Sequence, residues 1–198
     1  TTKRGKAGAA TLTYDGYIGV QAAPEDKLFD VLNTEQYIKY QKDEFGSDYS
    51  AFAGKPTVDW QDLVFKKGNA TSHNLTLSGG GQNATYSFGA GYFNQEGIQI
   101  SQNFTRFSAK ATTDVKVGKY LKFGESFLLS RTERQVQSEE TTNAGYGAAR
   151  NVPFFQPYTA NGEYNPANVT TTGGGTAQNY LWQADRDAGY TEMKSNKI

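Results

Sequence analysis

Aromatic residues and prolines gather in the second half of the chain, where Phe154, Phe155 and Tyr158 stand beside Pro153 and Pro157. Aromatic rings in such a segment can stack on sugar rings or line a peptide-binding site. They can equally pack the segment onto its neighbours, so both explanations stay open. Phe154, Phe155 and Tyr158 are therefore candidate substrate-binding residues.

Charged side chains recur on one parity of residues 104–117, where Arg106, Lys110, Asp114 and Lys116 alternate with less polar residues. Successive residues of a strand point to opposite faces, so a strand here carries all of these charges on one face. One explanation is a face that hydrates a channel interior. The sharper explanation is substrate guidance, which makes Arg106 and Lys110 further candidate binding residues.

Residues suited to catalysis or to metal binding are scarce. His73 is the only histidine, which excludes a His-rich metal site. Residues 185–189 look like the start of a calcium loop, but no Glu stands at the twelfth position. The glycine runs 79–81 and 173–175 lack the Lys of a phosphate-binding loop. We expect no catalytic residue, no metal ligand and no cofactor, and we find no convergent set that would make the chain an enzyme.

The composition favours strands over helices. The 198 residues include 13 Tyr, 12 Phe and 22 Gly, while the net charge is zero and no Cys is present. Zero net charge gives no electrostatic reason to expect a nucleic-acid partner. No apolar run reaches the roughly 20 residues of a membrane helix. The first residues are not a signal peptide and include no initiator Met, so we interpret the chain as an internal segment of a larger protein.

Five segments alternate apolar and polar residues at a period of two, which predicts long strands. They are residues 10–21, about 71–78, 84–95, 104–117 and 120–134. Their apolar parity comprises Leu12, Tyr14, Ile18, Tyr86, Phe88, Phe107, Val115, Phe123 and Leu129. Long strands with one apolar and one polar face are typical of a β-barrel in a membrane, where the apolar face meets lipid.

Short and long connections alternate between these strands. Tight glycine turns are predicted at residues 79–83 and 118–119. Residues 22–70 and 135–198 form the long connections, and short turns at one end with long loops at the other are typical of outer-membrane barrels. We expect one antiparallel meander in sequence order, with residues 135–198 outside the cell.

One short helix is expected within the first long connection. Asn33 and Gln36 have the spacing of a capping box, and Gly46 supplies a stop, so the helix should end near Phe45. Residues 56–68 are expected to be extended or looped. The chain then divides into a linker or plug end (1–9), five barrel strands with the first loop (10–134), and a long extracellular loop (135–198).

Seven short motifs, in order, resemble those of the SusC/RagA-like branch of TonB-dependent outer-membrane transporters. They are TTKRGK (1–6), YDGYIGVQ (14–21), LNTEQY (32–37), TVDWQD (57–62), HNLTLSGG (73–80), GYFNQEGI (91–98) and FTRF (104–107). The likeness covers residues 1 to about 134, continues more loosely through residues 149–155, and is poor after about residue 167. Transporters of this kind have a plugged barrel of about 22 strands.

The resemblance implies an all-β fold, namely a partial antiparallel transmembrane β-barrel with about five strands of a larger plugged barrel, one short helix and long extracellular loops. It implies import of an oligosaccharide or peptide through the bacterial outer membrane. The implied partners are a SusD-like lipoprotein, outer-membrane lipid, and TonB through a region absent from this sequence. The alternative is a surface or soluble β-domain that binds carbohydrate, in which a second sheet would cover the apolar face.

Overall fold

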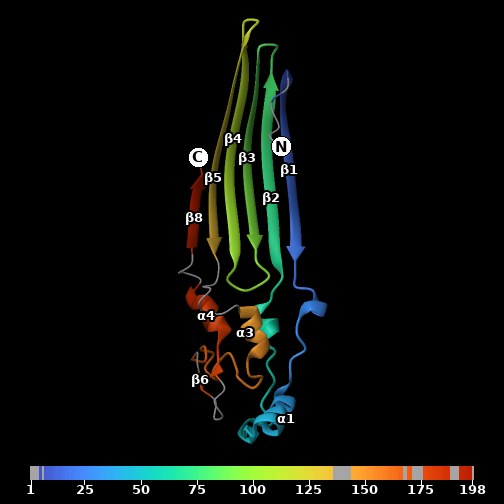
Figure 1. Cartoon of the computed structure of the whole chain (residues 1–198), viewed down its shortest axis with the longest axis vertical. Helices are drawn as coiled ribbons and strands as arrows, with labels where there is room; N and C mark the ends of the chain where they lie inside the picture. The colour runs from blue at the N-terminus through green and yellow to red at the C-terminus, as the bar shows by residue number, and fades with distance from the viewer. Residues whose placement is uncertain are drawn as a thin grey trace.

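The computed structural model describes residues 5, 7–135, 144–166, 169–170, 176–187 and 192–197. Its main feature is one long antiparallel sheet in the order β1-β2-β3-β4-β5-β8, with the helices gathered at one end (Figure 1). The strands of this sheet are β1 (Gly8–Gln21), β2 (Gly68–Gly80), β3 (Ala84–Glu96), β4 (Asn103–Val117), β5 (Leu121–Gln135) and β8 (Glu192–Lys197). The meander predicted for the first five strands is confirmed, because each pairs with its sequence neighbours.

The pairing register carries the period-two pattern across the sheet without a slip between β2 and β5. Leu77, Phe88, Ala111 and Phe127 face one another in turn across these four strands. A shift of one residue would send every such side chain to the other face, so the apolar parity itself fixes the register.

The apolar parity is left uncovered by the described residues. Eight of the nine side chains predicted to lie on it are exposed, with Ile18 at 77% and Phe123 at 64%, and Tyr86 is half-buried. The second described sheet pairs only β6 (Val169–Thr170) with β7 (Thr176–Ala177), which is too short to cover the first. The described part of the chain therefore lacks the second layer that the soluble alternative requires.

The apolar band has the height of a membrane interior. It runs along β4 from Val117 to Phe107, beyond which the same face becomes polar at Thr105 and Asn103. About ten residues at about 3.3 Å each span about 33 Å of strand. A strand tilt of about 45° reduces this to a height of about 23 Å, close to the apolar band of about 25 Å in outer-membrane barrels.

Tight turns close the hairpins at the end away from the helices (Figure 1). Residues 81–83 join β2 to β3, and Gly118 adopts a left-handed φ of 65° at the start of the next turn. That second turn has three residues, not the two predicted, because Tyr120 lies outside β5 with its side chain 99% exposed. The expected asymmetry of short turns and long loops is present.

The predicted helix is α1 (Thr34–Phe45), with the predicted cap. Asn33 Oδ1 accepts from the Gln36 backbone N–H at 2.9 Å, and Gln36 Oε1 accepts from the Asn33 N–H at 3.0 Å. Gly46 ends the helix with a φ of 64°. Within the described residues, no helix has both the length and the apolar character needed to cross a membrane.

Further short elements occupy segments for which the sequence predicts loops. The helices are α2 (Trp60–Val64), α3 (Ala144–Arg150) and α4 (Tyr180–Asp187), with single 3₁₀ turns η1 (Glu25–Lys27) and η2 (Ser50–Phe52). The expectation of one helix is therefore too low. Moreover, the chain after β5 returns to the sheet as β8, which pairs with β5 from Ser130 to Gln135.

Candidate functional site at the loop end of the sheet

The polar face of β4 carries Arg106 and Lys110, as the parity predicts. Arg106 is exposed, and its guanidinium carbon lies 5.7 Å from the centre of the Phe93 ring on β3. Lys110 is half-buried opposite Gly89, whose missing side chain leaves room for the lysine stem. Four residues of strand separate the two cations by about 13 Å. They therefore lie on the same face of the sheet but are too far apart to contact the same anionic group.

Nearer the turn end, the same face carries an ion pair. Lys122 Nζ lies 3.8 Å from Asp114 Oδ1, and Asp114 is the more buried partner. Gly124 lies opposite Asp114 and leaves space for its carboxylate. The predicted row of charges thus contains both signs. The Lys122–Asp114 ion pair lies at the turn end of the row, and the Arg106 guanidinium lies at the loop end.

The loops at the other end share a hydrophobic core that we call the cap. Its buried members are Tyr49, Trp60, Val64, Ala148, Val152, Phe154, Phe155, Ala177 and Tyr180. These residues come from the segment between β1 and β2 and from the segment after β5, and Ile100 of the β3–β4 connection packs against them. Residues far apart in sequence therefore meet in one cluster beside the end of the sheet (Figure 1).

Phe154 and Phe155 are central to the cap. Phe155 is 9% exposed and stacks on Trp60, with ring centres 5.7 Å apart. Phe154 is 5% exposed and packs on Phe52 and Tyr49. Of the two explanations that the sequence left open for these residues, packing onto neighbouring loops is the one that their positions fit.

Backbone hydrogen bonds tie the loops of the cap together. The Val58 N–H donates to the Pro153 carbonyl at 2.7 Å, and the Ile100 N–H donates to the Val64 carbonyl at 3.0 Å. The Ser101 hydroxyl donates to the Ala184 carbonyl at 3.1 Å. Each of the three connections at this end of the sheet is therefore bonded to another.

Asn179 is a structural residue that sequence reasoning missed. It is fully buried, and its Nδ2 donates to the carbonyls of Pro157 at 2.7 Å and Asn165 at 3.0 Å. Its Oδ1 accepts from the Trp182 N–H at 3.2 Å, which makes it the cap of α4. A sequence signal was present, because Asn179 directly precedes an aromatic-rich segment and Asn is a common residue at the start of a helix.

Tyr158 is the one exposed member of the three aromatic candidates, at 47%. Its ring stacks on Tyr164, with centres 5.2 Å apart and planes 26° from parallel. The Tyr164 hydroxyl donates to Asp185 Oδ2 at 2.5 Å, and this bond raises the pKa of Tyr164 to about 12. Two aromatic rings with a carboxylate at their edge offer apolar surface and a hydrogen-bond acceptor together.

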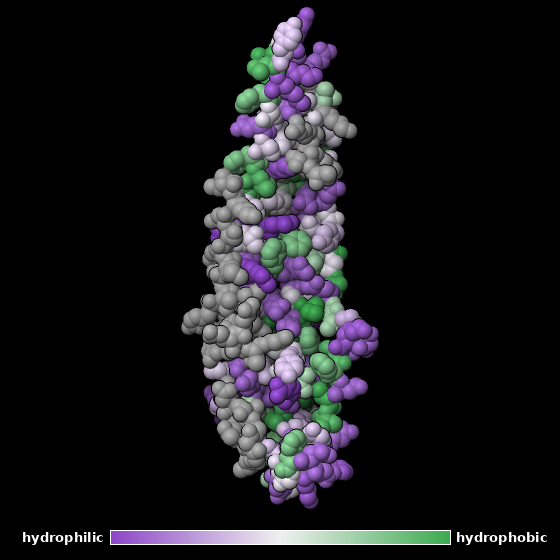
Figure 2. All heavy atoms as spheres, viewed as in Figure 1, coloured by the Kyte–Doolittle hydropathy of each residue, from purple (hydrophilic) through white to green (hydrophobic). Residues whose placement is uncertain are grey.

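The structure does not assemble the five candidates into one cluster. Arg106 and Lys110 lie on β4, Phe154 and Phe155 lie inside the cap, and Tyr158 lies on its surface. Figure 2 shows hydrophilic side chains interspersed with hydrophobic ones on the face seen there. Among the described residues, no three His, Cys, Asp or Glu side chains are grouped to hold a metal ion.

Four curated relatives match the sequence, and all of them are TonB-dependent receptors. The chain is 36% identical to the TonB-dependent receptor SusC of Bacteroides thetaiotaomicron over 110 residues, which are 55% of this chain and 11% of that protein. It is 28% identical to the TonB-dependent receptor P3 of Formosa agariphila over 171 residues, or 83% of this chain and 17% of that receptor. The chain thus spans between about a tenth and a sixth of the length of these relatives. No family model matches it.

Solved structures with a similar fold are also transporters. The RagAB peptide transporter superposes with a TM-score of 0.71 over 93% of this chain and 25% of that chain, at 16% identity. The RagAB peptide importer in its closed-closed state gives 0.69 over 89% of this chain and 24% of that chain, at 19% identity. The resemblance indicated by the sequence motifs is therefore confirmed: the chain is similar in sequence to a segment of TonB-dependent receptors of the SusC type and similar in fold to a segment of the RagAB transporter.

Proposed function

We propose that this chain is the part of a SusC-type nutrient importer that forms one section of the barrel wall and of its extracellular cap. The importer takes up glycans or peptides across the bacterial outer membrane, draws energy through TonB, and works with a SusD-like lipoprotein. The mechanism is binding and gated passage, without covalent chemistry. The observation that carries the proposal is the five-stranded meander, with its exposed apolar face and its loops joined in one core.

Two features of the sheet support a place in a larger barrel wall. The apolar band on β4 is about ten residues long, and at the strand tilt of about 45° that barrels have this length corresponds to a height of about 23 Å. The outer edge of β1 has no strand beside it among the described residues. In lipid every backbone polar group must be bonded within protein, so a strand in a membrane needs a neighbour on both edges.

The polar face and the cap surface suit the substrate side of the function. Arg106 and Lys110 give the polar face cations that attract carboxylates of peptides or acidic sugars. Tyr158, stacked on Tyr164 beside Asp185, offers an aromatic surface with an acceptor for sugar hydroxyls. We assign substrate contact to Tyr158 and substrate guidance to Arg106 and Lys110, and a packing role to Phe154 and Phe155.

Uptake by the complete receptor tests the proposal. A strain that produces the receptor is supplied with labelled oligosaccharides or labelled peptides, and accumulation is compared with a strain that lacks it. We expect uptake of one class, with TonB required, and a several-fold loss in Tyr158→Ala or Arg106→Gln. Equal uptake by both strains for both classes would contradict the importer.

Matched variants separate substrate contact from damage to the fold. Tyr120→Ala removes a tyrosine at the opposite, turn end, and Lys39→Gln removes a cation from the exposed surface of α1. Both should transport normally and reach the outer membrane in normal amount. If Tyr158→Ala also transports normally, the aromatic surface is not part of the substrate path.

A further inference from the structure

The face opposite the candidate site carries a hollow of about 430 Å³ that the proposed function does not use. Ligand sites commonly measure about 300–1,000 Å³. Ala90 and Ala109 face each other on β3 and β4, and Leu75 and Leu129 follow on the strands to either side. Because two methyl groups stand between two leucines, the sheet surface is indented along this row.

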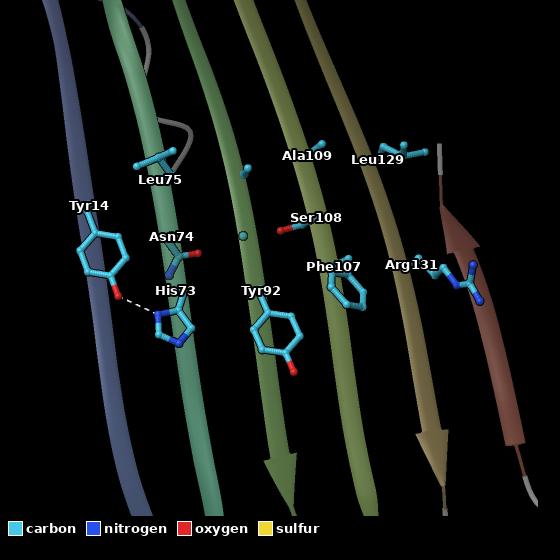
Figure 3. Close-up of a pocket in the computed structure, with 12 residues that line it drawn as sticks. Tyr14, His73, Asn74, Leu75, Tyr92, Phe107, Ser108, Ala109, Leu129 and Arg131 are labelled. Atoms are coloured by element: carbon cyan, nitrogen blue, oxygen red, sulfur yellow. Dashed lines mark hydrogen bonds between the residues drawn. The ribbon is translucent and has the colours of Figure 1, made fainter.

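Aromatic rings form the rim of the hollow on the side of the loops (Figure 3). His73, Tyr92 and Phe107 face one another on β2, β3 and β4. Their ring centres lie 6.3 Å apart for His73 and Tyr92, and 5.0 Å apart for Tyr92 and Phe107. Rings with a polar edge favour the boundary between membrane interior and headgroups, where one end is apolar and the other wet.

The rim continues onto β1 through a close approach. The Tyr14 hydroxyl lies 2.7 Å from His73 Nδ1 (Figure 3). The Tyr14 ring lies over Gly16, where a side chain would meet the tyrosine hydroxyl. The glycine thus lets the Tyr14 ring bend toward the loops and join the row.

Arg131 completes the rim on β5, opposite Phe107. Its side chain is 56% exposed, and one guanidinium nitrogen contacts Glu133 Oε1 at 2.5 Å. A guanidinium has five N–H donors in a fixed fork, so the contact with Glu133 leaves donors for a second anion. The hollow therefore has a cation at its loop end, the polar residues Asn74 and Ser108 next to the ring row, and the apolar side chains of Leu75, Ala109 and Leu129 further along the sheet (Figure 3).

We infer that this hollow binds one phosphorylated lipid of the outer leaflet. The phosphate bonds Arg131 at the level of the ring row, and one acyl chain lies on Ala90 and Ala109 between Leu75 and Leu129. The inference rests on the proposed membrane placement, because the hollow is continuous with the apolar face that would meet lipid. The polarity of the hollow, with its cation toward the loops, matches the direction of a lipid whose headgroup faces outward.

Lipid binding to the purified complete receptor tests the inference. Detergent-solubilised receptor is stripped of lipid and titrated with phosphatidylglycerol, and bound lipid is counted by native mass spectrometry. Diacylglycerol with the same acyl chains and inorganic phosphate serve as the two partial probes. We expect one tight phosphatidylglycerol, with binding of diacylglycerol weaker by about tenfold or more because it lacks the charged hydrogen bond to Arg131. Inorganic phosphate should bind more weakly still, because it lacks the acyl chains.

Paired variants locate the site on the sheet. Arg131→Gln and Ala109→Leu should each weaken the tight binding by about tenfold, whereas Arg131→Lys should retain more of it. The controls are Arg134→Gln, on the opposite face of β5, and Ala111→Leu, on the same face of β4 outside the hollow. Both controls should bind like the unchanged receptor, and their amount in the outer membrane reports folding.

Three outcomes would overturn the inference. They are equal binding of diacylglycerol and phosphatidylglycerol, unchanged binding in both hollow variants, and a change of oligomeric state in place of lipid loss. The last would mean that a second receptor copy covers the hollow. The assay measures lipid bound to purified protein, so its failure would contradict the lipid site alone. Failure of the proposed import function would instead appear as absent uptake.

Discussion

Phe52 and Phe154 stack face to face, with ring centres 4.1 Å apart and planes 14° from parallel. Phe52 belongs to the loop after β1, and Phe154 belongs to the segment after β5. Tyr49 packs beside both, with its ring centre 5.8 Å from that of Phe154. This stack is thus one of the aromatic contacts that hold together two loops leaving the sheet at separate strands.

Replacing Phe154 with alanine should loosen the cap and leave the sheet intact. Loss of a buried phenyl ring typically costs about 3–5 kcal/mol, and here the lost ring contacts Phe52, Tyr49 and Tyr37 of the loop between β1 and β2. We expect faster hydrogen exchange and faster proteolysis at α1, α2 and α4 in the complete receptor. Phe45→Ala is the matched control, because Phe45 is 64% exposed on α1. Equal protection in both variants would contradict a central role for Phe154.

A charge introduced on the apolar face should lower the free energy of unfolding more at mid-strand than near the loops. Phe88→Arg puts a guanidinium in the apolar band and should lower the free energy of unfolding in lipid vesicles by about 2–4 kcal/mol. Val20→Arg lies beyond the ring row, toward the loops, and should cost about 0–1 kcal/mol. Both side chains are exposed in this chain, at 47% and 68%. Equal costs would mean that lipid does not meet this face.

The tyrosine pair on the cap should weaken in strong alkali. The hydrogen bond to Asp185 raises the pKa of Tyr164 from 10.0 to about 12. The folded state therefore holds this proton more tightly than the unfolded state does, so the contribution of the bond is complete below pH 10. It is lost as the pH rises from about 10 to about 12. Phenolate absorbance, compared with that of Tyr164→Phe, should show one tyrosine that ionises late.

Removing the carboxylate provides the control for that titration. Asp185→Asn should lower the pKa of Tyr164 toward its ordinary value, because the bond to a charged acceptor is the largest cause of the shift. An unchanged titration in this variant would show that the Tyr164–Asp185 bond does not form in solution.

The sheet could be predicted from the sequence because its signals are local. Alternation at a period of two fixed the strands, and glycines fixed the turns between β2 and β3 and between β4 and β5. Asn33 and Gln36 likewise identified α1, because both halves of a capping box lie within four residues. In each case the residues that decide the structure lie beside one another in the chain.

The cap could not be predicted because its contacts are long-range. Phe155 is buried by Trp60 and Phe154 by Phe52, so no window around Pro153 shows whether these rings are exposed. β8 lacks an apolar parity and takes its conformation from pairing with β5. For α2, a weak signal was present: Asp59 Oδ1 accepts from the Gln61 N–H at 2.8 Å as a helix cap.

The sharing of one core by three connections also sets an order of events in folding. The buried members of this core come from two of these segments, and the contacts between the segments join distant parts of the chain. Long-range contacts of this kind form late, after strand pairing has brought the loops to one end. Substitutions in the cap should therefore speed its opening while leaving the rate of strand assembly unchanged.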